Sequence, residues 1–320
     1  MQAITLRSGL ERKSHLSRTF AAFKLQLRAL AYPQVTNTWL DLLNSHSLLR
    51  DMATAQPRLI HKVYRPWLSQ RMCRRQRLDA LIAHYRFVLQ CGWGEMVAEA
   101  ARRPMELAGF EGKSGARYSI ELCAVVPMER EGELVLQLRC GEALVYSVAF
   151  SFLPEGRKVQ VGIGCIQGPQ HGAGLELART ATRDLHGLRP KNLLVRLVRQ
   201  IGHASGCPQL VLVGNDNRTV ARKSLRQGKV KADYDSLWLE MGARRRHDGD
   251  YELDCEPLQP PCMDEVPSKK RSEVRKRHEL MESVNTAVLA QLAPKPGLNT
   301  PLPRERSRIE LVAAACAVAN

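Results

Sequence analysis

The sequence lacks the features that assign a protein to a class at sight. No stretch approaches the roughly 18 uninterrupted apolar residues of a transmembrane helix, and the start, MQAITLRSGLERKSH, has no apolar run typical of a secretory signal. The 9 cysteines are odd in number and include no CxxC pair, which argues against a disulfide framework and a zinc site. No Walker, GxGxxG or GxSxG motif is present. We therefore expect a cytoplasmic protein with no membrane span and no metal.

Positive charge is abundant and unevenly placed. The 320 residues contain 48 Lys and Arg against 32 Asp and Glu, a net charge of +16, and residues 1–110 alone carry 17 basic and 7 acidic residues. The segment Arg58–Arg77 has no acidic residue and includes Tyr64 and Trp67. Cations here could contact phosphates while the aromatic rings stack on bases. The alternative is a solvated helix face with both rings in the core. The candidate polyanion-binding residues are Arg65, Arg71, Arg74 and Arg75.

The first third of the chain has a helical pattern. Apolar residues from Leu16 to Leu30 recur at spacings of 3 and 4, which predicts a helix with one apolar stripe, ended by Pro33. Further helices are expected near 38–49, 74–89 and 95–103.

The apolar period then changes from 3.6 to 2. The segments YSIELCAVV, ELVLQLR, LVYSVAFSF and KVQVGIGCI alternate in hydropathy and are joined by short turn-like segments. They predict an antiparallel meander of four strands. We expect the apolar residues of the last strand, Val159 to Cys165 at every second position, to share one face.

A strand–helix–strand crossover follows. We expect a helix over 173–186, a turn at GLRP, a helix opened by Pro190 and ended by Gly206, and a buried strand over 209–214, parallel to the strand before the crossover. The exposed N–H groups of a helix start attract anions. Gly187, Arg189, Lys191 and Asn192 are thus a candidate anion or cofactor site, the alternative being a simple interhelical turn.

Other polar residues are weaker candidates for catalysis. Gln167 and Asn215 each follow a predicted strand, where ligands of open sheets tend to bind; either could instead satisfy local backbone groups. His186 could act as an acid or base or could cap a helix. Asp233 and Asp235 would share a face of an extended strand and could hold a metal or transfer protons, or pair with nearby cations.

Proline-rich residues 256–267 precede a last helix whose first turns carry Lys269, Lys270 and Arg271. These cations could grip nucleic acid or an anionic membrane face, or be a solvated flank. The fold class is therefore α+β or α/β, with a basic helical region at 1–110, a mixed, mainly antiparallel sheet core at 111–256, a linker and basic helix at 257–292, and a disordered tail at 293–320.

The motifs GFEGKSGARYSIELC, EGEL, IGCIQGP, TRDLHGLRPKNLL, VGN, ADYDSLWLEMGA and PSKKRSEVRKRHEL occur in this order. In them the chain resembles the VirK/YbjX family of bacterial proteins, from about Arg58 to Leu280. The resemblance implies a cytosolic protein of Gram-negative bacteria whose molecular activity is undefined. It also implies roles in virulence, resistance to antimicrobial peptides, and stress or DNA-damage responses.

A second resemblance is to the GNAT acyltransferase fold, in which a meander leads to a cofactor-binding loop, a helix and a diverging strand that ends near an asparagine. It implies that the loop Gly187–Asn192 binds the pyrophosphate of acyl-CoA. Residues 168–186 intervene, and GLRPKN replaces the glycine-rich signature. Three functions stay open: an undefined role shared with the VirK/YbjX family, an acyl-CoA-dependent acyltransferase, and a protein that binds nucleic acid or an anionic membrane. Whether the chain is an enzyme stays open too.

Overall fold

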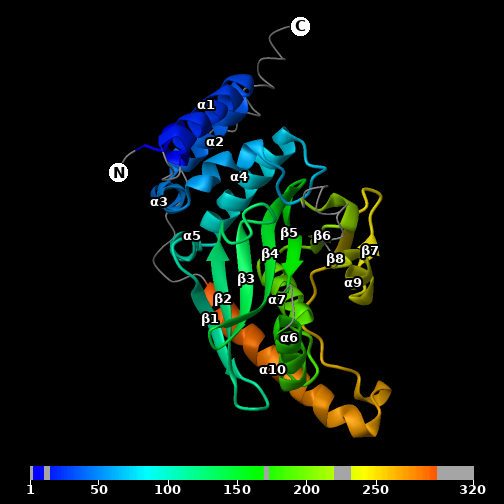
Figure 1. Ribbon diagram of the computed structural model, residues 1–320. Coiled ribbons are helices and arrows are strands. Elements are labelled where there is room, and N and C mark those ends of the chain that lie inside the picture. Colours follow the sequence, from blue (N-terminus) through cyan, green and yellow to red (C-terminus); the bar gives the residue numbers. More distant parts are fainter. Residues whose placement is uncertain (1–2, 11–14, 169–172, 220–231, 294–320) are drawn as a thin grey trace.

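A computed structural model describes residues 3–10, 15–168, 173–219 and 232–293 of the chain (Figure 1). A helical region comes first, a mixed sheet follows, and a long helix ends the described part. This order confirms the predicted fold class. The predicted domain boundaries stay predictions, and from residue 294 the predicted tail lies outside the described residues.

The helical region contains five α-helices and two 3-10 helices among the described residues. They are η1 (Leu6–Gly9), α1 (His15–Ala31), α2 (Pro33–Ser45), α3 (Ser47–Ala55), η2 (Pro57–Tyr64), α4 (Arg74–Gln90) and α5 (Gly94–Ala100). Pro33 ends the first helix as predicted and also opens the next, where its fixed φ suits the first helical position. The helix expected near 38–49 is divided at His46, which is extended and whose Nδ1 accepts a hydrogen bond from the Leu48 N–H at 3.2 Å.

Eight strands form one sheet in the order β1-β2-β3-β4-β5-β6-β8-β7. They are β1 (Met105–Glu111), β2 (Arg117–Ala124), β3 (Leu134–Cys140), β4 (Ala143–Glu155), β5 (Lys158–Gln167), β6 (Gln209–Leu212), β7 (Arg244–Arg245) and β8 (Tyr251–Asp254). The four-strand meander is confirmed as β2 to β5. Strand β1 was not predicted, because its pairing with β2 shifts register between Glu106 and Ala108 and so breaks the alternation.

The crossover after the meander is also confirmed. Helices α6 (Ala173–Asp184) and α7 (Pro190–Ala204) connect β5 to β6, and the two strands pair in parallel, with Val161 opposite Leu210 and Ile163 opposite Leu212. The rest of the described chain forms η3 (Asn215–Asn217), α9 (Tyr234–Glu240), β7, β8, η4 (Met263–Glu265) and α10 (Ser268–Leu292).

The main core lies on one face of the sheet. Leu122, Leu136 and Phe150 point to the same side, together with side chains of α5, α7 and α10. A smaller cluster, which includes Val135 and Ala149, lies on the other face. Cys165 packs against this second cluster, because the register between β4 and β5 shifts by one residue between Ala149 and Phe150. The prediction that Cys165 shares a face with Ile163 is therefore wrong.

A buried ion pair joins the helical region to the sheet. Lys62 Nζ in η2 lies 2.5 Å from Glu133 Oε1, next to the start of β3, and the two side chains are 3% and 0% exposed. The Tyr85 hydroxyl in α4 donates to the other oxygen of Glu133. Ser151 Oγ in β4 accepts from the Glu133 N–H at 2.8 Å. One carboxylate thus links η2, α4 and the sheet.

Candidate anionic-ligand site

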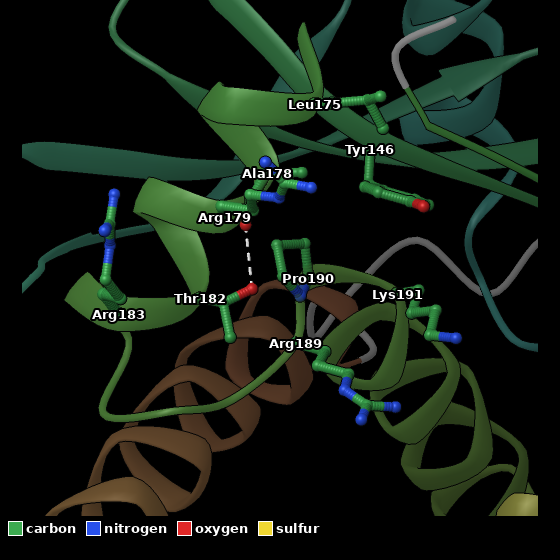
Figure 2. Close-up of a pocket in the computed structure, with 9 residues that line it drawn as sticks. All are labelled: Tyr146, Leu175, Ala178, Arg179, Thr182, Arg183, Arg189, Pro190 and Lys191. Carbon is green, nitrogen blue, oxygen red and sulfur yellow. Dashed lines mark hydrogen bonds between the residues drawn. The ribbon is translucent and has the colours of Figure 1, made fainter.

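A cavity of about 510 Å³ lies between α6 and α7, beneath Tyr146 of β4. Its volume is in the range of pockets that hold small ligands. Figure 2 shows α6 side chains on one side and Arg189, Pro190 and Lys191 on the other. The crossover therefore places the cavity beside the sheet, near the carboxyl end of β5, where the chain leaves the meander.

One part of the lining is apolar. It is formed by Tyr146, Leu175, Ala178 and Pro190. Leu175 is 54% exposed, so an apolar side chain faces the open space of the cavity. Burial raises the pKa of the Tyr146 hydroxyl, so the phenol stays neutral at physiological pH. Gly168 makes the ring position possible, since a Cβ there would approach the Tyr146 ring to 2.3 Å.

The other part of the lining is cationic. Arg179 and Arg183 lie one turn apart on α6, and Arg189 and Lys191 flank the first residue of α7. Glu176 pairs with Arg179 at 3.7 Å and with Arg183 at 3.0 Å, and Glu240 pairs with Arg189 at 2.5 Å. Lys191 has no ion pair with any residue that the structure describes. Four cations against two carboxylates leave the rim positive.

The start of α7 adds to this positive potential. Arg189 is the N-cap residue and provides no side-chain hydrogen bond to the first turn, and Pro190 occupies the first helical position. The partial positive charge of a helix N-terminus favours a nearby anion. Asn192 Oδ1 is buried and has no hydrogen-bond partner among the described residues. Asn192 does not line the cavity, so of the predicted anion-site residues at the start of α7 only Arg189 and Lys191 reach it.

The predicted anion site Gly187–Asn192 thus coincides with one wall of the cavity through Arg189 and Lys191. Gly187 shapes the turn before it. Its φ is +76°, a region that favours glycine, and a Cβ there would lie 2.8 Å from Glu273 Oε1. Arg277 of α10 donates from Nε to the His186 carbonyl at 2.8 Å. The turn is therefore held by the last helix.

The candidate catalytic residues do not gather at this cavity. Gln167 is exposed at the end of β5, opposite Ser147, and His186 lies in the turn after α6 with a φ of +52°. Neither lines the cavity, and Asn215 does not line it either. The structure therefore brings none of these three candidate catalytic residues to the cavity.

Asn215, Asp233 and Asp235 do meet, at the start of α9. Asn215 Nδ2 donates to Asp233 Oδ1 at 2.8 Å, and the Asn215 N–H donates to Asp235 Oδ1 at 2.8 Å. Asp233 is the N-cap of α9, and Asp235 lies in the first turn of this helix. The two aspartates are therefore not in the extended strand that was considered from the sequence. Hydrogen bonds from Ser236 and Asn215 lower the pKa of Asp233 to about 2. These hydrogen bonds cap the start of α9 and tie it to the loop after β6.

Tyr234 fills the gap that opens between β5 and β6. The ladder ends at Ile163 and Leu212, and beyond it the Tyr234 hydroxyl accepts from the Ile166 N–H at 2.8 Å and donates to the Ile166 carbonyl at 2.6 Å. Burial raises the pKa of this hydroxyl well above its ordinary value. Tyr234 therefore occupies the position beside Ile166 where the two strands part, and the cavity between α6 and α7 lies elsewhere.

The cations proposed to bind polyanions are mostly engaged with the protein. Arg65 pairs with Glu129 at 3.3 Å, Arg75 pairs with Asp79 at 3.2 Å, and Arg71 donates to the Asp248 carbonyl at 2.8 Å. The Arg74 guanidinium stacks over the Tyr32 ring at 3.4 Å.

The aromatic residues of that run are not free to stack on bases. Trp67 is buried, and the Tyr64 hydroxyl bonds with Thr36 at 2.6 Å. On α10, Lys269, Lys270 and Arg271 are exposed, and Arg271 Nε donates to the Val266 carbonyl at 3.1 Å.

The lining residues of α6 and Tyr146 of β4 were not predicted as parts of a site. Arg179 and Arg183 are four residues apart in a predicted helix, a spacing that signals a shared cationic face. No such signal existed for Tyr146, which the alternation placed on an apolar strand face. The described lining includes no carboxylate and no imidazole. Its cations can bind and orient an anion.

The chain was compared with known proteins. Its sequence matches the family model described as a protein of unknown function (DUF535) over residues 14–290. The chain belongs to this family. A relative, the uncharacterized protein YbjX of Escherichia coli (strain K12), is 29% identical over 267 residues, which cover 82% of this chain and 80% of the relative. The resemblance to the VirK/YbjX family is confirmed.

Two further relatives match more than half of this chain. An uncharacterized protein of Haemophilus influenzae is 24% identical over 254 residues, 79% of this chain and 84% of the relative. A protein named membrane protein LapB, of Mannheimia haemolytica, is 25% identical over 191 residues, 59% of this chain and 80% of the relative. These names state no catalytic activity. In this DUF535 chain, no helix of the described part is both long and apolar enough to cross a bilayer.

Proposed function

We propose that the protein binds an anionic ligand that carries an apolar arm in the cavity between α6 and α7, and that this ligand is an acyl-CoA. The observation that carries the proposal is the composition of the lining. Arg179, Arg183, Arg189 and Lys191 suit phosphate groups, and Tyr146, Leu175, Ala178 and Pro190 suit an acyl or pantetheine chain.

The order of elements supports acyl-CoA over other anions. The meander, the crossover, β6 and Asn215 follow one another as in the GNAT-like arrangement considered from the sequence. Two differences from that arrangement affect where a ligand would bind. An extra helix, α6, precedes the turn, and Tyr234 closes the gap between the parallel strands. The ligand would therefore lie outside the strands, against α6 and α7.

The proposal is for binding. A transferase would also need a group that accepts a proton from the attacking nucleophile, and the described lining contains no carboxylate or imidazole for that role. We further propose that binding serves the setting that the VirK/YbjX resemblance implies, namely virulence, resistance to antimicrobial peptides or the response to stress and DNA damage.

Calorimetric titration of the purified full-length chain tests the proposal. Octanoyl-CoA, coenzyme A and octanoate are compared, and octanoyl-CoA should bind more tightly than either fragment, because it alone uses both parts of the lining. Lys191→Glu should weaken octanoyl-CoA binding at least tenfold, since hydrogen bonds to charged groups contribute about 1.5–3 kcal/mol and about 1.4 kcal/mol is a factor of ten.

Arg157→Glu is the matched control. It makes the same change of charge at the turn of the β4–β5 hairpin, at the opposite end of both strands from Tyr146 and Gln167. Its affinity for octanoyl-CoA should equal that of the wild type. Equal losses in Lys191→Glu and Arg157→Glu would show that net charge alone attracts the ligand. Binding of octanoate as tight as that of octanoyl-CoA would refute a phosphate subsite.

A further inference from the structure

Helix α1 carries an apolar stripe that faces away from the protein. Phe20, Phe23, Leu27 and Leu30 are 69%, 58%, 51% and 76% exposed, whereas Leu25 is 2% exposed and holds the helix to its neighbours. The four residues recur at spacings of three and four, so they lie along one side of the helix. The sequence pattern predicted this stripe, and the residues that the structure describes leave it without cover.

The stripe is unusual for this chain. Of the eight exposed large apolar side chains that the described residues contain, four lie in the stripe and a fifth, Tyr32, directly follows α1. The other three are isolated from one another in the sequence, at Leu144, Leu175 and Leu239. Single exposed leucines are ordinary, but a contiguous apolar patch marks an interaction surface.

The charge around the stripe has one sign. Residues 12–40 contain five Lys or Arg and no Asp or Glu. On α1 itself, Lys24 is exposed four residues after Phe20, and Arg28 follows it by one further turn, half-buried. A row of cations therefore runs beside the row of apolar side chains. Figure 1 shows α1 at the end of the molecule farthest from α6 and α10, so a flat partner meets no obstruction from those helices.

We propose that α1 docks the protein on an anionic phospholipid surface. The stripe Phe20–Leu30 enters the boundary between headgroups and acyl chains, and Lys24 and Arg28 lie at the level of the lipid phosphates. A helix with apolar aromatic and leucine residues on one face and cations beside them lies in the plane of a membrane interface. With 17 residues, α1 is too short and too charged to span.

Charge distinguishes this partner from a second copy of the chain. Two copies that met through the stripe would bring the Lys24 and Arg28 rows of both helices together, and α1 has no acidic residue to pair with them. Like charges in contact oppose association. An anionic lipid surface instead attracts every cation of the row.

Co-flotation of the full-length chain with lipid vesicles tests the proposal. The protein should float with vesicles of phosphatidylethanolamine and phosphatidylglycerol and bind vesicles of phosphatidylcholine alone at least tenfold more weakly. Phe20→Ser/Phe23→Ser should reduce partitioning to the anionic vesicles at least about tenfold, because each aromatic ring buries apolar area in the lipid. Lys24→Glu should reduce it roughly fivefold or more at low salt.

Leu239→Ser is the control variant. Leu239 is 58% exposed, as Phe23 is, but lies on α9, so its substitution should leave vesicle binding unchanged. The double phenylalanine variant should keep the wild-type circular dichroism spectrum and urea midpoint, because both rings are exposed. A lowered midpoint would mean that the stripe packs within the protein and would overturn the proposal.

Two other outcomes also overturn it. One is equal flotation of the wild type and the double phenylalanine variant. The other is a wild-type dimer that the double variant converts to a monomer while neither floats, which would assign the stripe to a second copy. The proposal does not depend on acyl-CoA binding: Lys191→Glu should float like the wild type, and the double phenylalanine variant should bind octanoyl-CoA like the wild type.

Discussion

The buried pair of Lys62 and Glu133 should be the most sensitive point of the fold. Lys62→Met removes the cation 2.5 Å from Glu133 and leaves a carboxylate that is 0% exposed with the Tyr85 hydroxyl and no countercharge. Breaking a buried ion pair by removing one partner costs about 3–5 kcal/mol. That is a large part of the ~5–15 kcal/mol by which folded proteins are stable. Lys62→Met should therefore lower the free energy of unfolding by about 3–5 kcal/mol.

Urea unfolding followed by circular dichroism measures this loss. The double variant Lys62→Met/Glu133→Met removes both charges and should be less destabilised than Lys62→Met, since the remaining cost is mainly a Tyr85 hydroxyl without its acceptor, about 1–3 kcal/mol. Arg75→Met is the control. It breaks the Arg75–Asp79 pair, whose side chains are 74% and 46% exposed, and such pairs contribute about 0–1 kcal/mol.

Two results would refute this reasoning. A loss below about 1 kcal/mol in Lys62→Met would place the pair in contact with water. A loss in the double variant equal to the sum of the losses in Lys62→Met and Glu133→Met would show that the two side chains do not interact, because residues in direct contact give non-additive effects.

Two further changes test the interior. Burial, with Lys62 nearby, lowers the pKa of His84 to about 3 from its ordinary 6.5. Between these two values the imidazole is protonated in the unfolded chain but neutral in the folded protein. The free energy of unfolding should therefore fall as the pH drops below about 6.5 towards 3, by up to about 1.4 kcal/mol per pH unit. His84→Asn should flatten that slope in urea midpoints measured at pH 7 and pH 5, and parallel slopes would contradict the assignment. Tyr234→Phe leaves the Ile166 N–H and carbonyl without their partner and should cost about 1–3 kcal/mol, whereas Tyr32→Phe, at a side chain 39% exposed, should cost little in the same assay.

Local patterns were sufficient to predict the four-strand meander and the crossover, although not β1. Alternating hydropathy gave β2 to β5, and Pro190 and Gly206 bracket α7 because each suits one end of a helix. The crossover then required β5 and β6 to be parallel, since a helix returns the chain to the same end of the sheet. These features depend on residues close together in the sequence.

The features that could not be predicted depend on contacts between residues far apart in the sequence. The register shift between Ala149 and Phe150 sends Cys165 to the opposite face from Ile163. Gly164 within KVQVGIGCI is compatible with a bulge, but the two glycines of this segment do not tell which residue is the extra one. Asp233 looks like half of a metal or acid–base pair until Asn215, 18 residues away, donates to it. The cavity needs Tyr146 from β4 above two helices that follow it by 27 residues or more. Only the tertiary fold brings these groups together.

Long-range contacts also decide which of the excess cations are exposed to bind a partner. The run Arg58–Arg77 looks like the phosphate-binding surface, because no acidic residue interrupts it. Yet Lys62 and Arg65 pair with Glu133 and Glu129, which are 71 and 64 residues away in sequence, and Lys62 is buried. On α1 the cations stand beside exposed phenylalanines and leucines, in a helix that has no acidic residue. A cationic run indicates a binding surface only where the fold supplies no carboxylates to it, and in this protein α1 meets that condition better than Arg58–Arg77.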